Sequence, residues 1–269
     1  MSDDVGDIAA FYNSDPEKEH NRLVRNQLEY DLTWRYLHQY LPPQGSILEV
    51  GAASGRYTLE LAKRGYTVTA VDLSAALIEE CRKRIVAEGV EKHVRLVVAD
   101  ARDLGEITET GFDAVLLMGP LYHLIEEADR KAALKEAFSR LRARGVIFSS
   151  FLSRFGILGD LIRNVPGWIE DQAEVRSLLA SGKRPDDYPR GGFRGYSAKV
   201  SEIAPLREAI GFETITVVGV EPSISADDES YNKLQRKQRQ LWLDLLKEIG
   251  VERSIIGASR HLLYIGRKK

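Results

Sequence analysis

The sequence predicts an α/β fold: a doubly wound, seven-stranded, mostly parallel sheet with an N-terminal helical segment and a lid insertion of helix and loop. Three observations predict it. Short apolar runs alternate with patterns of helical spacing, as in a chain of βαβ units. A turn of small residues, 51–55, follows the first apolar run, and Asp72 follows the second. Ligands of open α/β sheets lie beyond the carboxyl ends of the strands, so we expect the functional site there.

The first βαβ unit occupies residues 46–72. An apolar run at 46–50 is typical of a buried parallel strand. Residues 57–64 have helical spacing and end at Gly65, a natural C-cap, and residues 67–71 form the second strand. The small residues between the first strand and the helix let a ligand lie close to the backbone. The acid that ends the unit is placed to accept hydrogen bonds from a ribose diol.

The rest of the chain continues this alternation. Further strands are expected at 94–100, 112–118, 145–150, 212–220 and 262–266, and further helices at 21–41, 75–86, 132–144, 155–180 with a break at 166–167, and 227–249. The last helix carries an apolar stripe, which we expect to pack in the core: Leu234, Leu241, Leu245 and Ile249, with Trp242 beside it.

Four parts follow from this pattern. They are an N-terminal helical cap (1–43), a ligand-binding core (44–150), a lid or substrate insertion (151–200), and a C-terminal part of the core sheet (201–269) with a helical insertion at 221–260. The lid contains a loop, 181–196, that is rich in Gly, Pro and Arg; loops of this length are typical of substrate covers, and a surface excursion is the alternative.

The glycine turn does not fit the dinucleotide fingerprint G-x-G-x-x-G. Gly51 matches the first glycine, but Ala53 and Arg56 stand at the second and third positions. Those two glycines serve the close approach of a pyrophosphate and the tight packing of the helix. A cofactor without a pyrophosphate is therefore favoured over NAD, which stays as a rival for an oxidoreductase.

At this point the chain resembles the class I S-adenosylmethionine-dependent methyltransferases. Their acid-x-G-x-G-x-G turn is seen as Glu49 to Gly55, with Ala53 in place of the middle glycine. The acids that end the second and third strands are Asp72 and Asp100, and the segment 112–124 follows in the order of the family. The resemblance covers residues 40–150 and returns at the last two strands. It implies S-adenosyl-L-methionine as cofactor and S-adenosyl-L-homocysteine as product.

The resemblance also implies roles for single residues. Asp72 would hold the ribose diol, Leu73 the sugar or adenine face, and Asp100 with Ala101 the adenine. The turn under the methionine part and the lining on the methyl side complete the set of cofactor residues: Gly51, Ala52, Ala53, Gly55, Met118 and Gly119. Arg22 or Arg25 would reach the cofactor's carboxylate, although a solvated basic face is the favoured interpretation.

Methyl transfer requires mainly that the acceptor and the methyl carbon are held in line, so a catalytic side chain is optional. His123 is the candidate general base, because histidine titrates near neutrality and this residue follows the fourth strand. Tyr122 would line the acceptor site and Tyr12 would close the pocket, with plain packing as the alternative for all three. His20 and Tyr30 are weaker candidates.

Composition sets the outer limits. The chain has 269 residues, a formal net charge of −2 and one cysteine, Cys81, which we expect to be a packing residue. The balanced charge disfavours nucleic acid as a partner, and no apolar run is long enough to span a membrane. The five histidines show no metal-ligand spacing, so no metal is expected. The expected context is a cytoplasmic monomer or homodimer.

The sequence therefore predicts an enzyme that transfers a methyl group from S-adenosyl-L-methionine to an oxygen or nitrogen of a small molecule. One alternative is methylation of a protein or RNA, with the arginine-rich loop at 183–196 as the docking surface. Another is a non-catalytic module that binds the same cofactor. The sequence does not identify the acceptor.

Overall fold

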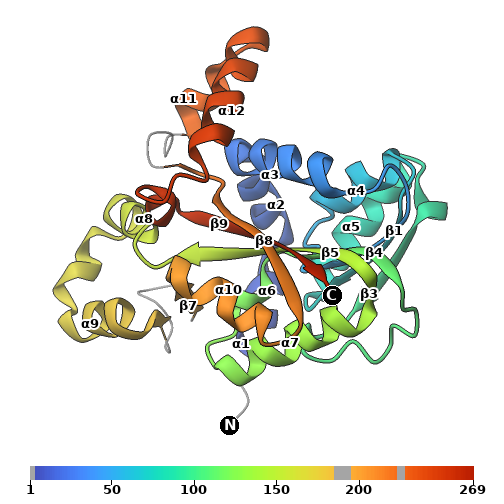
Figure 1. Ribbon diagram of the computed structural model, residues 1–269, viewed down its shortest axis with the longest axis horizontal. Coiled ribbons are helices and arrows are strands. Elements are labelled where there is room, and N and C mark those ends of the chain that lie inside the picture. The colour runs from blue at the N-terminus through green and yellow to red at the C-terminus, as the bar shows by residue number, and fades with distance from the viewer. Residues whose placement is uncertain (1–3, 185–194, 223–227) are drawn as a thin grey trace.

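The computed structural model describes residues 4–184, 195–222 and 228–269 of the chain, which form a mixed sheet flanked by helices (Figure 1). The strands are β1 (Ser46–Val50), β2 (Thr67–Asp72), β3 (Val94–Val98), β4 (Phe112–Leu117), β5 (Leu141–Ser153), β6 (Lys183–Arg184), β7 (Gly195–Ala198), β8 (Phe212–Gly219) and β9 (His261–Lys268). The predicted α/β fold class is confirmed.

Helices precede, link and cover these strands. The α-helices are α1 (Gly6–Ser14), α2 (Pro16–Arg25), α3 (Gln27–Tyr40), α4 (Arg56–Lys63), α5 (Ala75–Ala87), α6 (Pro120–His123), α7 (Glu127–Arg140), α8 (Ile157–Asn164), α9 (Gln172–Ser181), α10 (Val200–Glu208), α11 (Asp228–Lys233) and α12 (Arg236–Ile249). Short 3₁₀ turns are η1 (Glu91–His93), η2 (Pro166–Glu170) and η4 (Ile256–Ala258).

The strand order places the site. The parallel strands run β3-β2-β1-β4-β5, and β9 then pairs antiparallel with both β5 and β8. The order of strands along the chain reverses between β1 and β4, which are parallel neighbours. In doubly wound sheets this switch point opens a crevice at the carboxyl ends of the strands. The small-residue turn after β1 and the segment after β4 both lie at that crevice.

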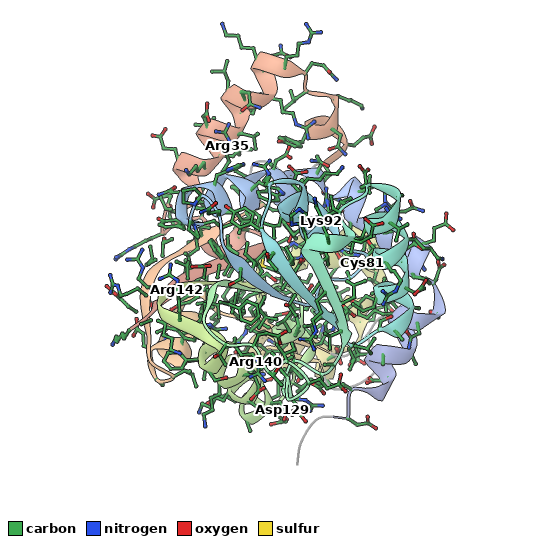
Figure 2. All side chains as sticks on the ribbon, turned by 90° about the vertical axis from the view of Figure 1, so that its right-hand side faces the viewer. Arg35, Cys81, Lys92, Asp129, Arg140 and Arg142 are labelled. Carbon is green, nitrogen blue, oxygen red and sulfur yellow. The ribbon has the colours of Figure 1, made fainter. Side chains whose placement is uncertain are left out.

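Alternating side chains of the central strands fill two cores. Ile47 belongs to the cluster that α3 and α4 cover, whereas Leu48 and Val50 belong to the cluster under α7 and α10. All three are 2% exposed or less. The two helical layers lie on opposite sides of the sheet in Figure 1. Cys81 is fully buried on α5, as expected of a packing residue (Figure 2).

Several helix boundaries differ from the prediction. The helix expected at 21–41 is two helices, α2 and α3, separated at Asn26, and α1 precedes them. The helix expected at 132–144 is α7, which begins at Glu127 and ends at Arg140, because Leu141 already pairs with Phe112 of β4. The hairpin of β6 and β7 extends the sheet beside the end of β5.

The prediction for the last insertion was wrong in part. The expected helix 227–249 is broken after Lys233, and α12 starts anew at Arg236. Leu234 and Ile249 of the expected stripe do pack against the core, but Leu243 and Leu246 are buried in place of Leu241 and Leu245. Leu241, Trp242 and Leu245 are 58%, 43% and 43% exposed on a helical pair that projects from the body (Figure 1, Figure 2).

The predicted loop and the predicted division of the chain into four parts are only partly covered by the described residues. The predicted loop 181–196 falls largely on residues 185–194, which lie outside the described residues. The division at 43, 150 and 200 stays a prediction. Within the described ranges, no helix combines the length and the apolar character needed to cross a membrane.

Candidate functional site

A cavity lies at the switch point of the sheet, between the carboxyl ends of β1, β2 and β4 and the two N-terminal helices. The floor comes from the turn after β1, the ends of β2 and β3, and the segment 118–124. The cover comes from Ile8 and Tyr12 of α1 and from Glu19, Arg22 and Leu23 of α2. The space between floor and cover is about 150 Å³. The N-terminal segment is thus a cap over the predicted site.

The turn after β1 brings backbone to the cavity wall. Gly51 has a φ of +85°, and a Cβ at this position would lie 2.6 Å from the Met118 carbonyl oxygen. Ala53 is left-handed as well, with a φ of +49°, and its amide faces the end of β2. Gly55 does not line the cavity: it begins α4 with a φ of +82° and packs against Cys81. Its predicted contact with the cofactor stays a prediction.

Asp72 is held in a fixed orientation at the end of β2. Its Oδ2 accepts a hydrogen bond of 2.8 Å from the Ala53 amide, and its Oδ1 accepts one of 2.9 Å from the Ser74 amide. Burial raises the pKa of this carboxyl to about 6, against the opposing effect of the amides. At neutral pH it is a carboxylate that faces the cavity, as the prediction for a ribose-binding acid requires.

Glu49 is a cavity residue that was not among the residues selected from the sequence. Its side chain is fully buried in β1 and lines the cavity, and Thr58 donates a hydrogen bond of 2.5 Å to Oε2. The other oxygen, Oε1, has no hydrogen-bond partner among the described residues. Burial raises the pKa of this carboxyl to about 8. An unsatisfied buried carboxyl beside the glycine turn fits the ammonium group of a methionine moiety.

The far side of the floor combines apolar and acidic groups. Leu73 and Leu77 line it with their side chains, next to Asp100 and Ala101. Asp100 already accepts hydrogen bonds from the Arg102 side chain, at 2.6 Å to Nη2, and from the Arg102 amide at 2.8 Å. Arg102 therefore fixes the predicted adenine-binding acid in position, and the apolar side chains form a surface that suits a purine ring.

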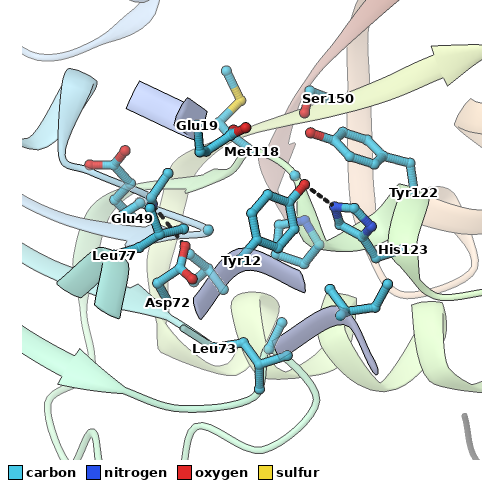
Figure 3. Close-up of a pocket in the computed structure, with 18 of the residues that line it drawn as sticks. Tyr12, Glu19, Glu49, Asp72, Leu73, Leu77, Met118, Tyr122, His123 and Ser150 are labelled. Carbon is cyan, nitrogen blue, oxygen red and sulfur yellow. Dashed lines mark hydrogen bonds between the residues drawn. The ribbon is translucent and has the colours of Figure 1, made fainter. Parts of the chain in front are cut away.

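At the opposite end, the predicted acceptor residues come together (Figure 3). The Tyr12 hydroxyl lies 3.1 Å from Nε2 of His123, and their rings are 5.5 Å apart and nearly perpendicular. Burial raises the pKa of the Tyr12 phenol well above its usual value, so it keeps its proton. A neutral His123 with its proton on Nδ1 accepts this hydrogen bond. Tyr122 also lines the cavity, and burial raises the pKa of its phenol.

Anchors to α5 and to the glycine turn hold the cap in place. The Asn13 side-chain oxygen accepts hydrogen bonds from the Ser74 hydroxyl at 2.7 Å and from the Ala76 amide at 3.1 Å. His20 lies 3.0 Å from the Ser54 hydroxyl through Nδ1, and Arg84 donates to its Nε2 at 2.7 Å. His20 is thus an anchor of the cap and not a group of the cavity.

Tyr30 and the two arginines of α2 differ in whether they line the cavity. Tyr30 packs beneath the Arg56 guanidinium, 3.9 Å from ring centroid to carbon, and does not line the cavity. Arg22 does line it and donates two hydrogen bonds to Glu19, whereas Arg25 does not. The Arg22 side chain is still 40% exposed, so the interpretation of both arginines as a solvated face stays a prediction.

Three further lining residues had no signal in the sequence. Glu29, Ser150 and His261 come from α3, β5 and β9 and meet at the cavity only because the sheet brings these elements together. No group of histidine, cysteine and acidic side chains among the described residues is arranged to hold a metal ion.

Comparison with known proteins agrees with this geometry. The family described as "Methyltransferase domain" matches residues 47–145, which include β1 to β4 and the whole floor of the cavity from Val50 to Leu124. This domain belongs to the class I S-adenosylmethionine-dependent methyltransferases. Its cofactor is S-adenosyl-L-methionine.

Individual relatives extend the comparison. The methyltransferase domain is similar to the tRNA 5-carboxymethoxyuridine methyltransferase of Escherichia coli, with 29% identity over 141 residues, 50% of this chain and 52% of the relative. It is also similar to a ubiquinone biosynthesis O-methyltransferase of Xanthomonas axonopodis, with 32% identity over 140 residues, 52% of this chain and 54% of the relative. The chain spans about half the length of these curated relatives.

A solved structure matches nearly the whole fold. The 1,6-didemethyltoxoflavin-N1-methyltransferase of Burkholderia thailandensis, with bound S-adenosylhomocysteine, has a TM-score of 0.60 and 18% identity. The match covers 98% of this chain and 86% of that chain. The methyltransferase domain, its N-terminal cap and its C-terminal strands are therefore arranged as in a known methyltransferase fold.

Proposed function

We propose that this chain is an enzyme that transfers a methyl group from S-adenosyl-L-methionine to an oxygen or nitrogen of a small molecule. One observation carries the proposal. A single capped cavity has an unsatisfied buried carboxyl, Glu49, near one end and a hydrogen-bonded pair, Tyr12 and His123, at the other. The first end suits the binding of the cofactor, and the second suits proton removal from an acceptor.

Each group of the cavity would have a separate task when the cofactor is bound. The cofactor supplies an electrophilic methyl group on a sulfonium. Asp72, fixed by two amides, would accept hydrogen bonds from the ribose hydroxyls, and Glu49 would pair with the ammonium group. Arg22 would face the carboxylate group from the cap side.

The acceptor end would position the nucleophile and take up its proton. Tyr12 holds the His123 ring by a hydrogen bond to Nε2. An acceptor hydroxyl or amine that replaces Tyr12 at this nitrogen would deliver its proton to His123 as it bonds to the methyl carbon, while the bond between this carbon and sulfur would break and leave S-adenosyl-L-homocysteine. The cap keeps water from the cavity while this happens, because α1 and α2 lie across its opening.

RNA is the alternative acceptor. It is favoured by the similarity to a tRNA methyltransferase, which outweighs the balanced net charge as an argument about partners. A tRNA acceptor would bind with strong salt dependence, whereas a neutral small acceptor would not.

Two experiments test the proposal. Calorimetric titration with S-adenosyl-L-homocysteine and with NAD should give binding for the first compound alone, and Asp72→Ala should abolish it. NAD binding with no response to S-adenosyl-L-homocysteine would refute the proposal. A screen of metabolite pools and of total tRNA with cofactor labelled on the methyl group then separates the two acceptor classes.

A further inference from the structure

A second cavity lies on the other side of the connection between α6 and α7. Its volume is about 380 Å³, within the range of roughly 300–1,000 Å³ typical of small-molecule sites. The start of α7, the strands β6 and β7, and α10 surround it, with Phe151 of β5 among the lining residues. None of the residues described as lining it also lines the first cavity.

Arg207 of α10 lines this cavity as a buried guanidinium with two nitrogens that have no hydrogen-bond partner among the described residues. Its side chain is 1% exposed, and its guanidinium carbon lies 4.2 Å from the ring centroid of Phe151. Nη1 donates a hydrogen bond of 2.7 Å to the Ile203 carbonyl oxygen. Nε and Nη2 are buried and have no hydrogen-bond partner among the described residues. These two nitrogens share the edge of the guanidinium that binds both oxygens of a carboxylate.

A neighbouring arginine shows what a satisfied buried guanidinium looks like. Arg154 is also 1% exposed, but its Nη2 donates to the Glu202 carboxylate at 2.7 Å, and Ser197 and Ser181 supply carbonyl oxygens at 3.1 Å. Arg207 forms no ion pair with any described residue. Burial, helped by the positive charge of Arg130, lowers the pKa of Arg207 to about 9. Its environment therefore lacks one negative charge.

We propose that the second cavity binds a small monocarboxylate with an apolar body, whose two oxygens pair with Nε and Nη2 of Arg207. One negative charge suffices, because the acids of the wall have cations of their own: Glu126 pairs with Lys183, Glu127 with Lys131 and Glu202 with Arg154.

Apolar side chains of the cavity would contact the apolar body of the ligand. Phe151, Ile203 and Leu206 line the cavity beside Arg207. The unpartnered edge of the guanidinium is closed off from solvent, so a carboxylate reaches it only when neighbouring side chains of the wall move aside. A carboxylate on a ring or short chain has the shape and charge for this arrangement.

Sodium benzoate is the probe, titrated into the full chain by calorimetry with benzamide and inorganic phosphate as comparison ligands. Wild-type protein should bind benzoate saturably and neither comparison ligand. Arg207→Met should weaken benzoate binding by at least about tenfold, because two charge-assisted hydrogen bonds are lost. Arg253→Met, at an exposed cation, is the matched control and should bind benzoate as wild type does.

Stability of the variant separates a ligand site from a packing role. Replacing an unpaired buried cation by a side chain of similar volume should raise the Tm of the protein without ligand. Affinity for S-adenosyl-L-homocysteine should stay unchanged, so the test does not depend on the proposed function. Absence of benzoate binding to the wild type, equal binding to Arg207→Met, or a lower Tm of that variant would each overturn the proposal.

Discussion

Glu49 makes the cofactor affinity of this protein depend on pH in a way that can be worked out in advance. Its pKa of about 8 means that at pH 7 about nine in ten molecules carry the protonated carboxyl. Pairing with an ammonium group requires the carboxylate, so binding must remove this proton. The cost is about 1.4 kcal/mol at pH 7 and doubles at pH 6. Affinity for S-adenosyl-L-homocysteine should therefore rise about eightfold between pH 6.5 and 7.5.

The direction of this pH dependence follows from the raised pKa of Glu49. A raised carboxyl pKa leaves the free protein protonated at neutral pH, so binding improves as the pH rises towards 8 and levels off above it. The chosen window lies above the pKa of Asp72, about 6, whose own titration then contributes little. Calorimetry in two buffers of different ionisation enthalpy should report the release of about 0.9 protons per ligand at pH 7.

Glu49→Gln is the matched variant. The amide keeps the volume of the side chain and can still accept the hydrogen bond from Thr58, but it has no proton to release. Affinity of the variant should be nearly constant between pH 6.5 and 7.5, with no proton release. Equal pH dependence in both proteins, or none in the wild type, would refute the assignment of Glu49 to the ammonium group.

Three further outcomes are expected. Gly51→Ala should reduce the free energy of unfolding by more than Gly65→Ala does in denaturant titrations. Both residues have a positive φ, which costs an alanine about 1–2 kcal/mol, but only at Gly51 would the added Cβ also clash, because a Cβ at Gly65 meets open space. Equal losses in the two variants would refute the clash. His123→Ala should lower kcat by about 100-fold and leave affinity for S-adenosyl-L-homocysteine within about twofold, so an unchanged kcat would return His123 to packing. The pKa of His20 is lowered by burial and by Arg84, so the anchoring of the cap is complete above about pH 6.5 and is lost as the pH falls through the lower folded value. The protection factors of the α2 amides against hydrogen exchange should therefore fall at low pH in wild type and stay constant in His20→Gln, and pH-independent protection in wild type would contradict this role.

Local patterns were sufficient for the core of the fold. Strands β1, β2 and β4 and the turn between β1 and α4 follow from short-range periodicity and from small residues, so Asp72 and Ala53 could be placed at the site from the sequence. Glu49 had a signal, since it opens the acid-x-G-x-G-x-G turn, but an acid inside an apolar strand does not reveal whether its second oxygen is satisfied.

Long-range contacts explain what the sequence could not supply. Glu29 and His261 are more than 200 positions apart and meet at one cavity through the pairing of β9 with β5. Arg22 lies on α2, and the side of α2 that faces the cavity depends on the bend at Asn26. No glycine or proline marks this bend in the sequence. The rotation of α12 likewise depends on a break without glycine or proline.

The capped cavity also has a consequence for the rate of catalysis. A nucleoside of the size of the proposed cofactor must pass α1 and α2 to enter or leave, because these helices lie across the opening of the cavity. Each exchange of spent for fresh cofactor must first detach Asn13 from the start of α5 and His20 from Ser54. We expect the speed of this outward swing to limit turnover, so variants with weakened anchors should exchange the nucleoside faster and bind it less tightly.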